Sequence, residues 1–187
     1  MSEDTQSETT SLVAMRALIG EPIGPPSVAP DPVNQPMIRH WAVALQDHNP
    51  VYTDPAFAAA SRFGGIVAPP LMLQTWTMPT PELTGIAARG GAPTAGGENP
   101  LTLLDDVGFI ATLATNSEFE IVRYLRLGEV ITSTMVLESI SDKKQTRLGP
   151  GHFITWVTTY RDEQGAVVGR QTFRILKFKP DLEALLR

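Results

Sequence analysis

The segment from Asp47 to Asp54 places carboxylates, an imidazole, an amide and a phenol close together in the sequence DHNPVYTD. Groups of these types act as general acids and bases when a fold directs them into one cleft. Pro50 forces a turn after a predicted helix, so an acid at the start and polar groups five and seven residues later can converge. The pattern is also typical of a plain connector, in which Asp47 and Asn49 cap the turn between two helices. On spacing alone, the connector is favoured.

The chain offers little for other reaction classes. It has no cysteine, which excludes a zinc-thiolate site, an iron–sulfur cluster and a thiol nucleophile. No Gly-x-Ser-x-Gly turn presents a serine, and we expect His40 and His152 to be structural or solvent-facing. A proline turn separates His40 from His48 and no third ligand accompanies them, so we predict no metal site. The glycine pairs at 90–91 and 96–97 lack the Lys-Ser/Thr of a phosphate loop.

Composition describes an ordinary globular protein. The 187 residues carry a net charge of −5 and are 42% hydrophobic, which suits one domain with its own core. No apolar run approaches the roughly 18 residues that cross a bilayer, and residues 1–10 lack the pattern of a signal peptide. The acidic balance argues against binding to a phosphate backbone. We therefore expect a cytoplasmic protein that binds neither membranes nor nucleic acids.

The elements that must position the segment 47–54 are helices in the first half and strands in the second. Apolar spacing of three and four residues, with capping and proline signals, predicts helices over residues 11–19, 37–46, 55–60 and 71–78. Alternation and β-branched residues predict strands over 118–127, 130–140, 152–160 and 166–178, with hairpin turns at 141–151 and 162–165. This order predicts an α+β fold with the helices against one face of an antiparallel sheet.

Glycine and proline, 15 and 16 residues respectively, concentrate in two places. Prolines forbid a continuous helix over residues 20–36, and glycines predict a loop over residues 79–100. A loop of about 20 residues inside a compact domain is either functional or disordered. We predict a single domain over residues 11–180, preceded by a disordered tail at 1–10. Residues 181–187 are expected to be a C-terminal tail or the start of a linker to a further domain.

Two blocks of sequence resemble the MaoC-like hot-dog hydratases and dehydratases. They are DxNP at 47–50, followed by an acid at 54, and FGGIVAPP at 63–70. The likeness extends to GEVI at 128–131, RLGPG at 147–151 and the final strand with Gln171-Thr172, and it covers about residues 11–178. It implies a hot-dog fold, in which an antiparallel sheet wraps around a short central helix at residues 70–78.

The reaction of that family is the addition of water to a trans-2-enoyl thioester, or its reverse. It requires a base for the water, an acid for the α-carbon and amide donors for the enolate oxygen. Active members carry Asp-x-Asn-Pro-x-His, whereas here Asp47, Asn49 and Pro50 match and Tyr52 replaces the histidine. A phenol with a pKa of about 10 stays protonated at pH 7 and cannot act as the imidazole does. We therefore expect a degenerate motif and no catalytic residue on this chain.

The tyrosine form of the motif resembles the N-terminal, non-catalytic hot dog of two-hot-dog enzymes. It looks most like the large subunits of the actinobacterial heteromeric enoyl-CoA hydratases of steroid side-chain degradation. The resemblance implies a second hot-dog subunit with the intact Asp-x-Asn-Pro-x-His motif, in a heterodimer or heterotetramer. It also implies acyl-CoA as the substrate, and no cofactor. The alternatives are a self-sufficient hydratase that uses Asp47 and a non-enzymatic protein that binds acyl-CoA.

The same resemblance implies the remaining site residues. The acyl group is expected to lie along the central helix, at Ala68, Pro69, Pro70, Leu71, Thr75 and Trp76. Because Pro79 and Pro81 stop this helix early, we predict room for a bulky acyl group such as a steroid; a mere surface loop at 79–100 is the alternative. Lys143, Lys144 and Arg147 form the densest basic stretch, which suits either CoA phosphates or a solvated hairpin tip.

Overall fold

A sheet of six strands forms the body of the protein in a computed structural model that describes residues 3–78 and 99–180. Its strand order is β1-β3-β5-β6-β2, with β4 paired to β5, and all pairs are antiparallel. The strands are β1 (Ser27–Val28), β2 (Ala111–Ile121), β3 (Thr132–Ile140), β4 (Lys144–Thr146), β5 (Gly149–Arg161) and β6 (Val167–Phe178). The predicted antiparallel sheet is therefore confirmed.

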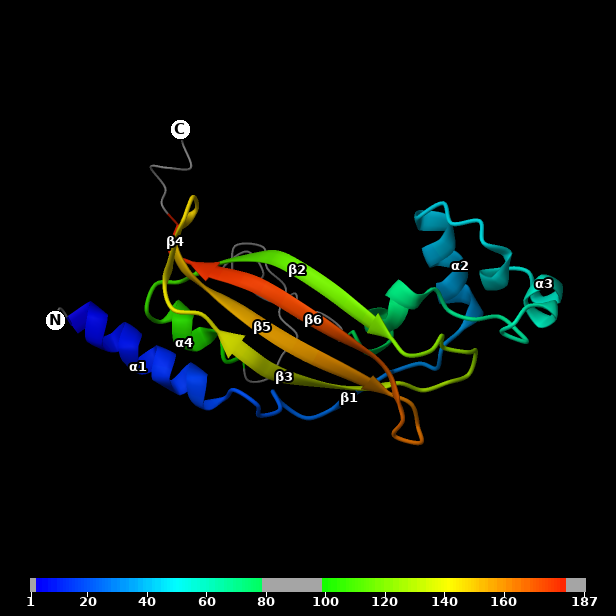
Figure 1. Ribbon diagram of the computed structural model, residues 1–187, viewed down its shortest axis with the longest axis horizontal. Helices are drawn as coiled ribbons and strands as arrows, with labels where there is room; N and C mark the ends of the chain where they lie inside the picture. The colour runs from blue at the N-terminus through cyan, green and yellow to red at the C-terminus, as the bar shows by residue number, and fades with distance from the viewer. Residues whose placement is uncertain (1–2, 79–98, 181–187) are drawn as a thin grey trace.

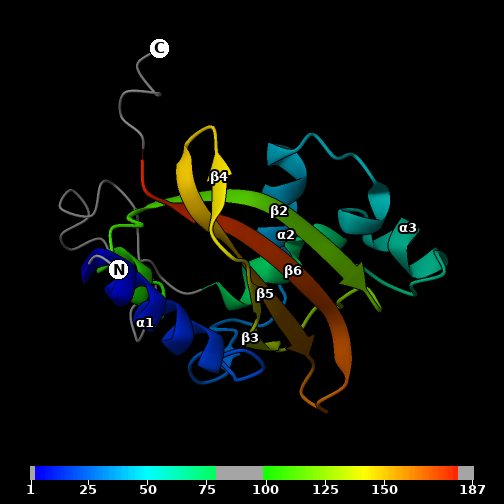
Figure 2. The same ribbon diagram turned by 60° about the vertical axis from the view of Figure 1, so that its left-hand side comes forward.

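Six helical elements, counted over the described residues, accompany the sheet. They are the α-helices α1 (Glu3–Ala17), α2 (Gln35–Ala44), α3 (Pro55–Ala60) and α4 (Thr102–Asp105), and the 3₁₀-helices η1 (Pro50–Tyr52) and η2 (Pro70–Thr77). Figure 1 shows α1 and α4 at one end of the long sheet and α2 and α3 at the other, and Figure 2 shows the same molecule turned. None of the helices in the described ranges is both long and apolar enough to cross a lipid bilayer.

Local capping explains where α2 and α3 begin. The side chain of Asn34 accepts a hydrogen bond from the Met37 N–H at the start of α2. The carboxylate of Asp54 accepts from the N–H groups of Ala56 and Phe57 at 2.9 and 3.0 Å, and Pro55 occupies the first turn of α3. Both residues satisfy donors that a helix leaves free at its N-terminus. The helix predicted at residues 55–60 is confirmed in full.

The β5–β6 hairpin turns at the predicted residues 162–165. The Asp162 carboxylate accepts hydrogen bonds from the N–H groups of Gln164 and Ala166 at 3.1 and 2.9 Å. Gly165 has a φ of +80°, which favours glycine because a side chain is strained there. The two strands that this turn joins run through the centre of the sheet.

Two apolar clusters lie along one face of the sheet. The first packs η2 against residues that include Ile131 of the loop before β3 and Tyr160 of β5. The second packs α1 and α4 against residues that include Leu137 of β3 and Trp156 of β5. Trp156 and Tyr160 are separated by an even number of positions on one strand, so they share a face. Hence η2 covers one half of this face, while α1 and α4 cover the other.

A helix occupies most of the segment for which the sequence predicts a disordered tail. The helix α1 starts at Glu3, so the prediction of a disordered segment at 1–10 is wrong for residues 3–10; residues 1 and 2 lie outside the described residues. Glu8 is 8% exposed and its carboxylate pairs with Lys143 at 2.8 Å. This contact joins residues that are distant in sequence, so no local pattern at 1–10 could predict it.

The first long strand also differs from the prediction. β2 occupies Ala111–Ile121 instead of residues 118–127, and most of its side chains are exposed. A strand at the edge of a sheet with little burial on either face has no alternating apolar pattern, so its first half gave no signal. Of the loop predicted at 79–100, all but residues 99 and 100 lie outside the described residues, and so does the tail predicted at 181–187.

Candidate functional site

The segment 47–54 forms a capped connection between α2 and α3. The Asp47 carboxylate accepts a hydrogen bond from the Asn49 N–H at 3.0 Å, and the Asn49 side chain accepts from the Val51 N–H at 3.3 Å. Pro50 then begins η1. Asp47 and Asn49 are both exposed. The segment therefore adopts the connector geometry, in which these two side chains satisfy the backbone of the turn.

Tyr52, at the position of the family's histidine, lies inside the protein. The residue is 6% exposed, and its carbonyl accepts a hydrogen bond from the Gln35 side chain at 2.8 Å. Burial raises the pKa of its phenol, the charges of Tyr124 and Asp47 raise the pKa further, and a hydrogen bond with Asn49 lowers it in part. The phenol consequently keeps its proton at neutral pH, and the group cannot serve as a general base there.

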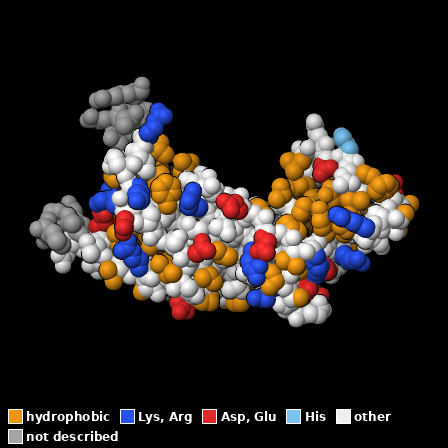
Figure 3. Space-filling view, in the orientation of Figure 1, with side chains coloured by type: hydrophobic (Ala, Val, Ile, Leu, Met, Phe, Trp, Pro, Cys, Tyr) orange, Lys and Arg blue, Asp and Glu red, His pale blue; other side chains and the backbone are white. Residues whose placement is uncertain are grey.

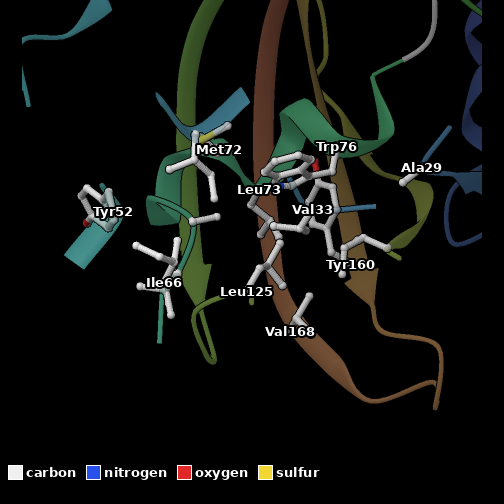
Figure 4. Packing of buried hydrophobic residues seen from close by; sticks show 14 of the residues in the cluster. Ala29, Val33, Tyr52, Ile66, Met72, Leu73, Trp76, Leu125, Tyr160 and Val168 are labelled. Atoms are coloured by element: carbon white, nitrogen blue, oxygen red, sulfur yellow. The ribbon is translucent and has the colours of Figure 1, made fainter. Parts of the chain in front are cut away.

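The short helix η2 is packed into the first apolar cluster. Its buried side chains Met72, Leu73 and Trp76 point into this cluster (Figure 4). It is a 3₁₀-helix rather than an α-helix, and it ends at Thr77. The Thr77 hydroxyl accepts a hydrogen bond from the Ser133 hydroxyl at 2.9 Å, and the Thr77 carbonyl accepts one from the Ser27 hydroxyl at 3.1 Å. Its C-terminal end is therefore fastened to β3 and β1.

The six residues predicted to line an acyl pocket divide into two groups. Ala68, Pro69 and Trp76 are buried within the protein's own core, and the indole N–H of Trp76 has no acceptor among the described residues. Pro70 and Thr75 are half-buried, and Leu71 is 53% exposed. Only this second group presents surface to a molecule outside the chain.

A polar network that the sequence did not reveal joins η2 to the sheet. The Gln171 amide donates to the Gln74 side chain at 2.7 Å and to the Ser117 hydroxyl at 3.0 Å, while its carbonyl oxygen accepts from the Tyr160 hydroxyl at 3.0 Å. Gln171 and Tyr160 are both buried. A glutamine at a buried position of β6 is the one signal that the sequence offers, because a buried amide needs partners.

A close approach of backbone and helix accompanies this network. A Cβ added at Gly169 of β6 would lie 2.6 Å from the Leu73 side chain and 2.8 Å from the Glu120 carbonyl. Any side chain at this position would displace η2 or β2. The absence of a side chain therefore lets η2 rest directly on the sheet.

The predicted CoA-binding residues lie at the far end of the molecule from the segment 47–54. Lys143, Lys144 and Arg147 belong to the connection around β4, whereas α2 and α3 stand at the opposite end (Figure 1). Lys143 is already paired with Glu8. The structure thus does not bring these three residues together with the motif.

Histidines do not form a metal site in the part of the chain that is described. No three His, Asp or Glu side chains there lie close enough together to hold a metal ion. His40 and His48 are exposed, while His152 is fully buried with its Nδ1 at 2.9 Å from the Ser141 carbonyl. His152 also packs edge-on against Phe109. Its position indicates a structural role.

Comparison with known proteins places this geometry in a family. The family model described as FAS1-like, dehydratase domain region, matches residues 17–171. The chain belongs to the FAS1-like dehydratase family. A solved structure, the ChsH1-ChsH2 complex from Mycobacterium tuberculosis, contains a chain that is 37% identical with a TM-score of 0.77; the match covers 94% of this chain and 93% of that chain. The predicted hot-dog fold is therefore confirmed.

Two curated relatives of this FAS1-like chain carry functional names. A probable enoyl-CoA hydratase alpha subunit from Thermomonospora curvata is 46% identical over 168 residues, which cover 89% of this chain and 51% of the relative. The 3-oxo-4,17-pregnadiene-20-carboxyl-CoA hydratase alpha subunit of Mycobacterium tuberculosis is 42% identical over 158 residues, or 83% of this chain and 48% of the relative. The FAS1-like chain thus spans about half the length of these curated relatives.

Proposed function

We propose that this chain is a subunit of a heteromeric enoyl-CoA hydratase and that a partner hot-dog chain supplies the catalytic Asp and His. The observation that carries the proposal is the state of the motif. Asp47 is engaged with the Asn49 N–H, and Tyr52 is a buried phenol where an imidazole is required. A base for water and an acid for the α-carbon must then come from elsewhere. The role of this chain is to shape the acyl pocket.

The proposed substrate is a trans-2-enoyl-CoA with a bulky, steroid-type acyl group, and water is added without a cofactor, in the cytoplasm. One relative is named for a pregnadiene-carboxyl-CoA. The end of η2 at Thr77 leaves Met135 of β3, 38% exposed, between the two apolar clusters and on the same face as Ser133. Because α1 and α4 cover the far half of this face, the acyl group is proposed to lie along the exposed strip around Met135.

The proposed partner is a second hot-dog subunit with an intact Asp-x-Asn-Pro-x-His motif, in a heterodimer or heterotetramer. Strand β2 pairs with β6 on one side and leaves a long free edge within the described sheet. Free edges recruit further strands unless they are covered. The end of the molecule that contains α2 and α3 offers the partner a second surface. It carries exposed apolar side chains, including Val43, Leu45 and Phe57 (Figure 3). Burial of both surfaces supports a stable complex.

Reconstitution tests the proposal. The hydration of a steroid-type enoyl-CoA and of a short enoyl-CoA is followed by the loss of enone absorbance, for this chain alone and together with a candidate partner. We expect activity only in the mixture and a preference for the bulky substrate. Asp47→Asn removes the carboxylate but keeps an oxygen to accept from the Asn49 N–H, so the turn is preserved and activity should persist. The matched control replaces the Asp of the partner's motif and should abolish turnover.

Other outcomes identify the alternatives. Turnover by the purified chain alone, lost in Asp47→Asn, would contradict the proposal and favour a self-sufficient hydratase. Binding of acyl-CoA without turnover in any mixture with a hot-dog partner would favour a non-enzymatic binding protein. The two results are separated by measuring binding and turnover on the same samples.

A further inference from the structure

A pocket of about 370 Å³ adjoins the connection that contains the motif, because the N–H of its lining residue Val67 donates to the Val51 carbonyl at 3.4 Å. Its walls come from the loop after α3 and from the segment between β2 and β3. The first supplies Arg62 and Phe63, and the second supplies Arg123, Tyr124 and Arg126. The two walls are joined by backbone: Ala68 N–H donates to the Leu125 carbonyl at 2.8 Å. The pocket is thus part of the fixed fold.

The charges of this pocket are not balanced. Arg123 forms salt bridges with Glu129 at 2.8 Å and with Asp162 at 2.7 Å, so these two acids are already engaged. Arg62 and Arg126 have no acidic partner within the described residues, and both are exposed. The pocket therefore offers two guanidinium groups to an anion. Guanidinium groups suit phosphate because they donate hydrogen bonds in a planar fork.

Aromatic rings accompany the two arginines. The rings of Phe63 and Tyr124 lie 4.9 Å apart between centroids at an angle of 43°, and the Arg62 guanidinium lies 4.8 Å from the centre of Phe63. Both rings are half-buried, so part of each remains available. Paired guanidinium and aromatic groups match a ligand that joins a heteroaromatic base to phosphates, since the base stacks and the phosphates accept hydrogen bonds.

The position of the pocket suits one end of an acyl-CoA molecule. Tyr124 lines the pocket, and it also packs against the apolar cluster that contains Tyr52 of the motif. The basic residues around β4, by contrast, stand at the opposite end of the sheet (Figure 1). In a CoA thioester, a flexible arm separates the nucleotide from the reacting acyl group. A phosphate site apart from the strip around Met135, where we propose that the acyl group lies, fits that geometry.

We propose that the pocket between Arg62 and Arg126 binds the adenosine phosphate portion of acyl-CoA. This inference rests on the proposed function, because it takes a CoA thioester as the substrate. It replaces Lys143, Lys144 and Arg147 as the nucleotide site. The phosphates contact Arg62 and Arg126, and the adenine lies against Phe63 or Tyr124.

Calorimetric titration of the full chain with adenosine 3′,5′-bisphosphate tests the site directly. We expect the bisphosphate to bind, and we expect Arg62→Gln and Arg126→Gln each to weaken binding about tenfold, the typical loss of one charge-assisted hydrogen bond. Both side chains are exposed, so the fold is retained, which circular dichroism verifies. The matched control is the double variant Lys144→Gln, Arg147→Gln, which should bind as the wild type does. Inorganic phosphate and pantetheine serve as partial ligands and should bind much more weakly.

Several results would overturn the inference. One is that the wild-type chain does not bind the bisphosphate, and another is that the two arginine variants bind it as tightly as the wild type. A third is that the β4 double variant loses binding instead. The last is an affinity for inorganic phosphate equal to that for the bisphosphate. The hydratase assay keeps this test separate from the proposed function. Hydration whose KM is unchanged by Arg62→Gln and Arg126→Gln would refute the pocket alone. Bisphosphate binding that both arginine variants weaken, without hydration in any mixture, would refute the hydratase alone.

Discussion

At the scale of single residues, Tyr160 shows how a buried polar group ties the site to the sheet. Its hydroxyl donates a hydrogen bond to the side-chain carbonyl oxygen of Gln171 at 3.0 Å. This glutamine oxygen accepts from no second donor among the described residues. Tyr160→Phe leaves the buried oxygen without a partner, so we expect a loss of about 1–3 kcal/mol in the free energy of unfolding at pH 8. Urea unfolding followed by tryptophan fluorescence measures this loss.

The same residue predicts a pH dependence. Burial raises the pKa of the Tyr160 phenol above its ordinary value of about 10. Above pH 10 the unfolded chain releases this proton while the folded protein retains it, so the free energy of unfolding falls as pH rises. One such group contributes a slope of at most about 1.4 kcal/mol per pH unit. Tyr160→Phe should flatten the decline above about pH 10, and a slope equal to that of the wild type would contradict this account.

At the scale of elements, α1 is a structural part of the domain. Met15 is fully buried in the second apolar cluster, whereas Val13 on the same helix is 62% exposed. Met15→Ala should cost about 2–5 kcal/mol of the free energy of unfolding, and Val13→Ala should change it by less than about 0.5 kcal/mol. Thermal or urea unfolding of the two variants makes the comparison. Two variants that both unfold like the wild type would mean that α1 does not pack on the sheet in solution.

At the scale of the whole molecule, the free edge of β2 predicts how the partner binds. Leu113 of β2 is 47% exposed, so Leu113→Lys should leave the fold of the single chain intact. We expect this charge to weaken association with a hot-dog partner by about tenfold or more, because an edge lysine disfavours strand pairing. Val13→Lys, on exposed surface of α1, is the control and should not affect association. Analytical ultracentrifugation of the mixtures would show whether β2 is the interface; equal association of both variants would exclude it.

Local sequence alone determined the features that depend on neighbouring residues. Pro55 and Asp54 predicted the start of α3, and the turn residues 162–165 predicted the central hairpin. The spacing of 47–54 favoured the capped connector that the structure contains. The identity of residue 52 likewise sufficed to predict a motif without an imidazole. In each case, a few adjacent residues define both the backbone geometry and the hydrogen bonds.

Only the tertiary structure decided the features built from distant residues. The docked α1 brings Met15 into the second apolar cluster and Glu8 to Lys143, and the network under η2 joins Gln171 to Gln74. The pocket that contains Arg62 and Arg126 forms where two separate loops come together. No periodic pattern in the sequence predicts such contacts, because each partner alone is an ordinary polar residue. Their energies arise from burial and pairing, which exist only once the sheet has brought the segments into contact.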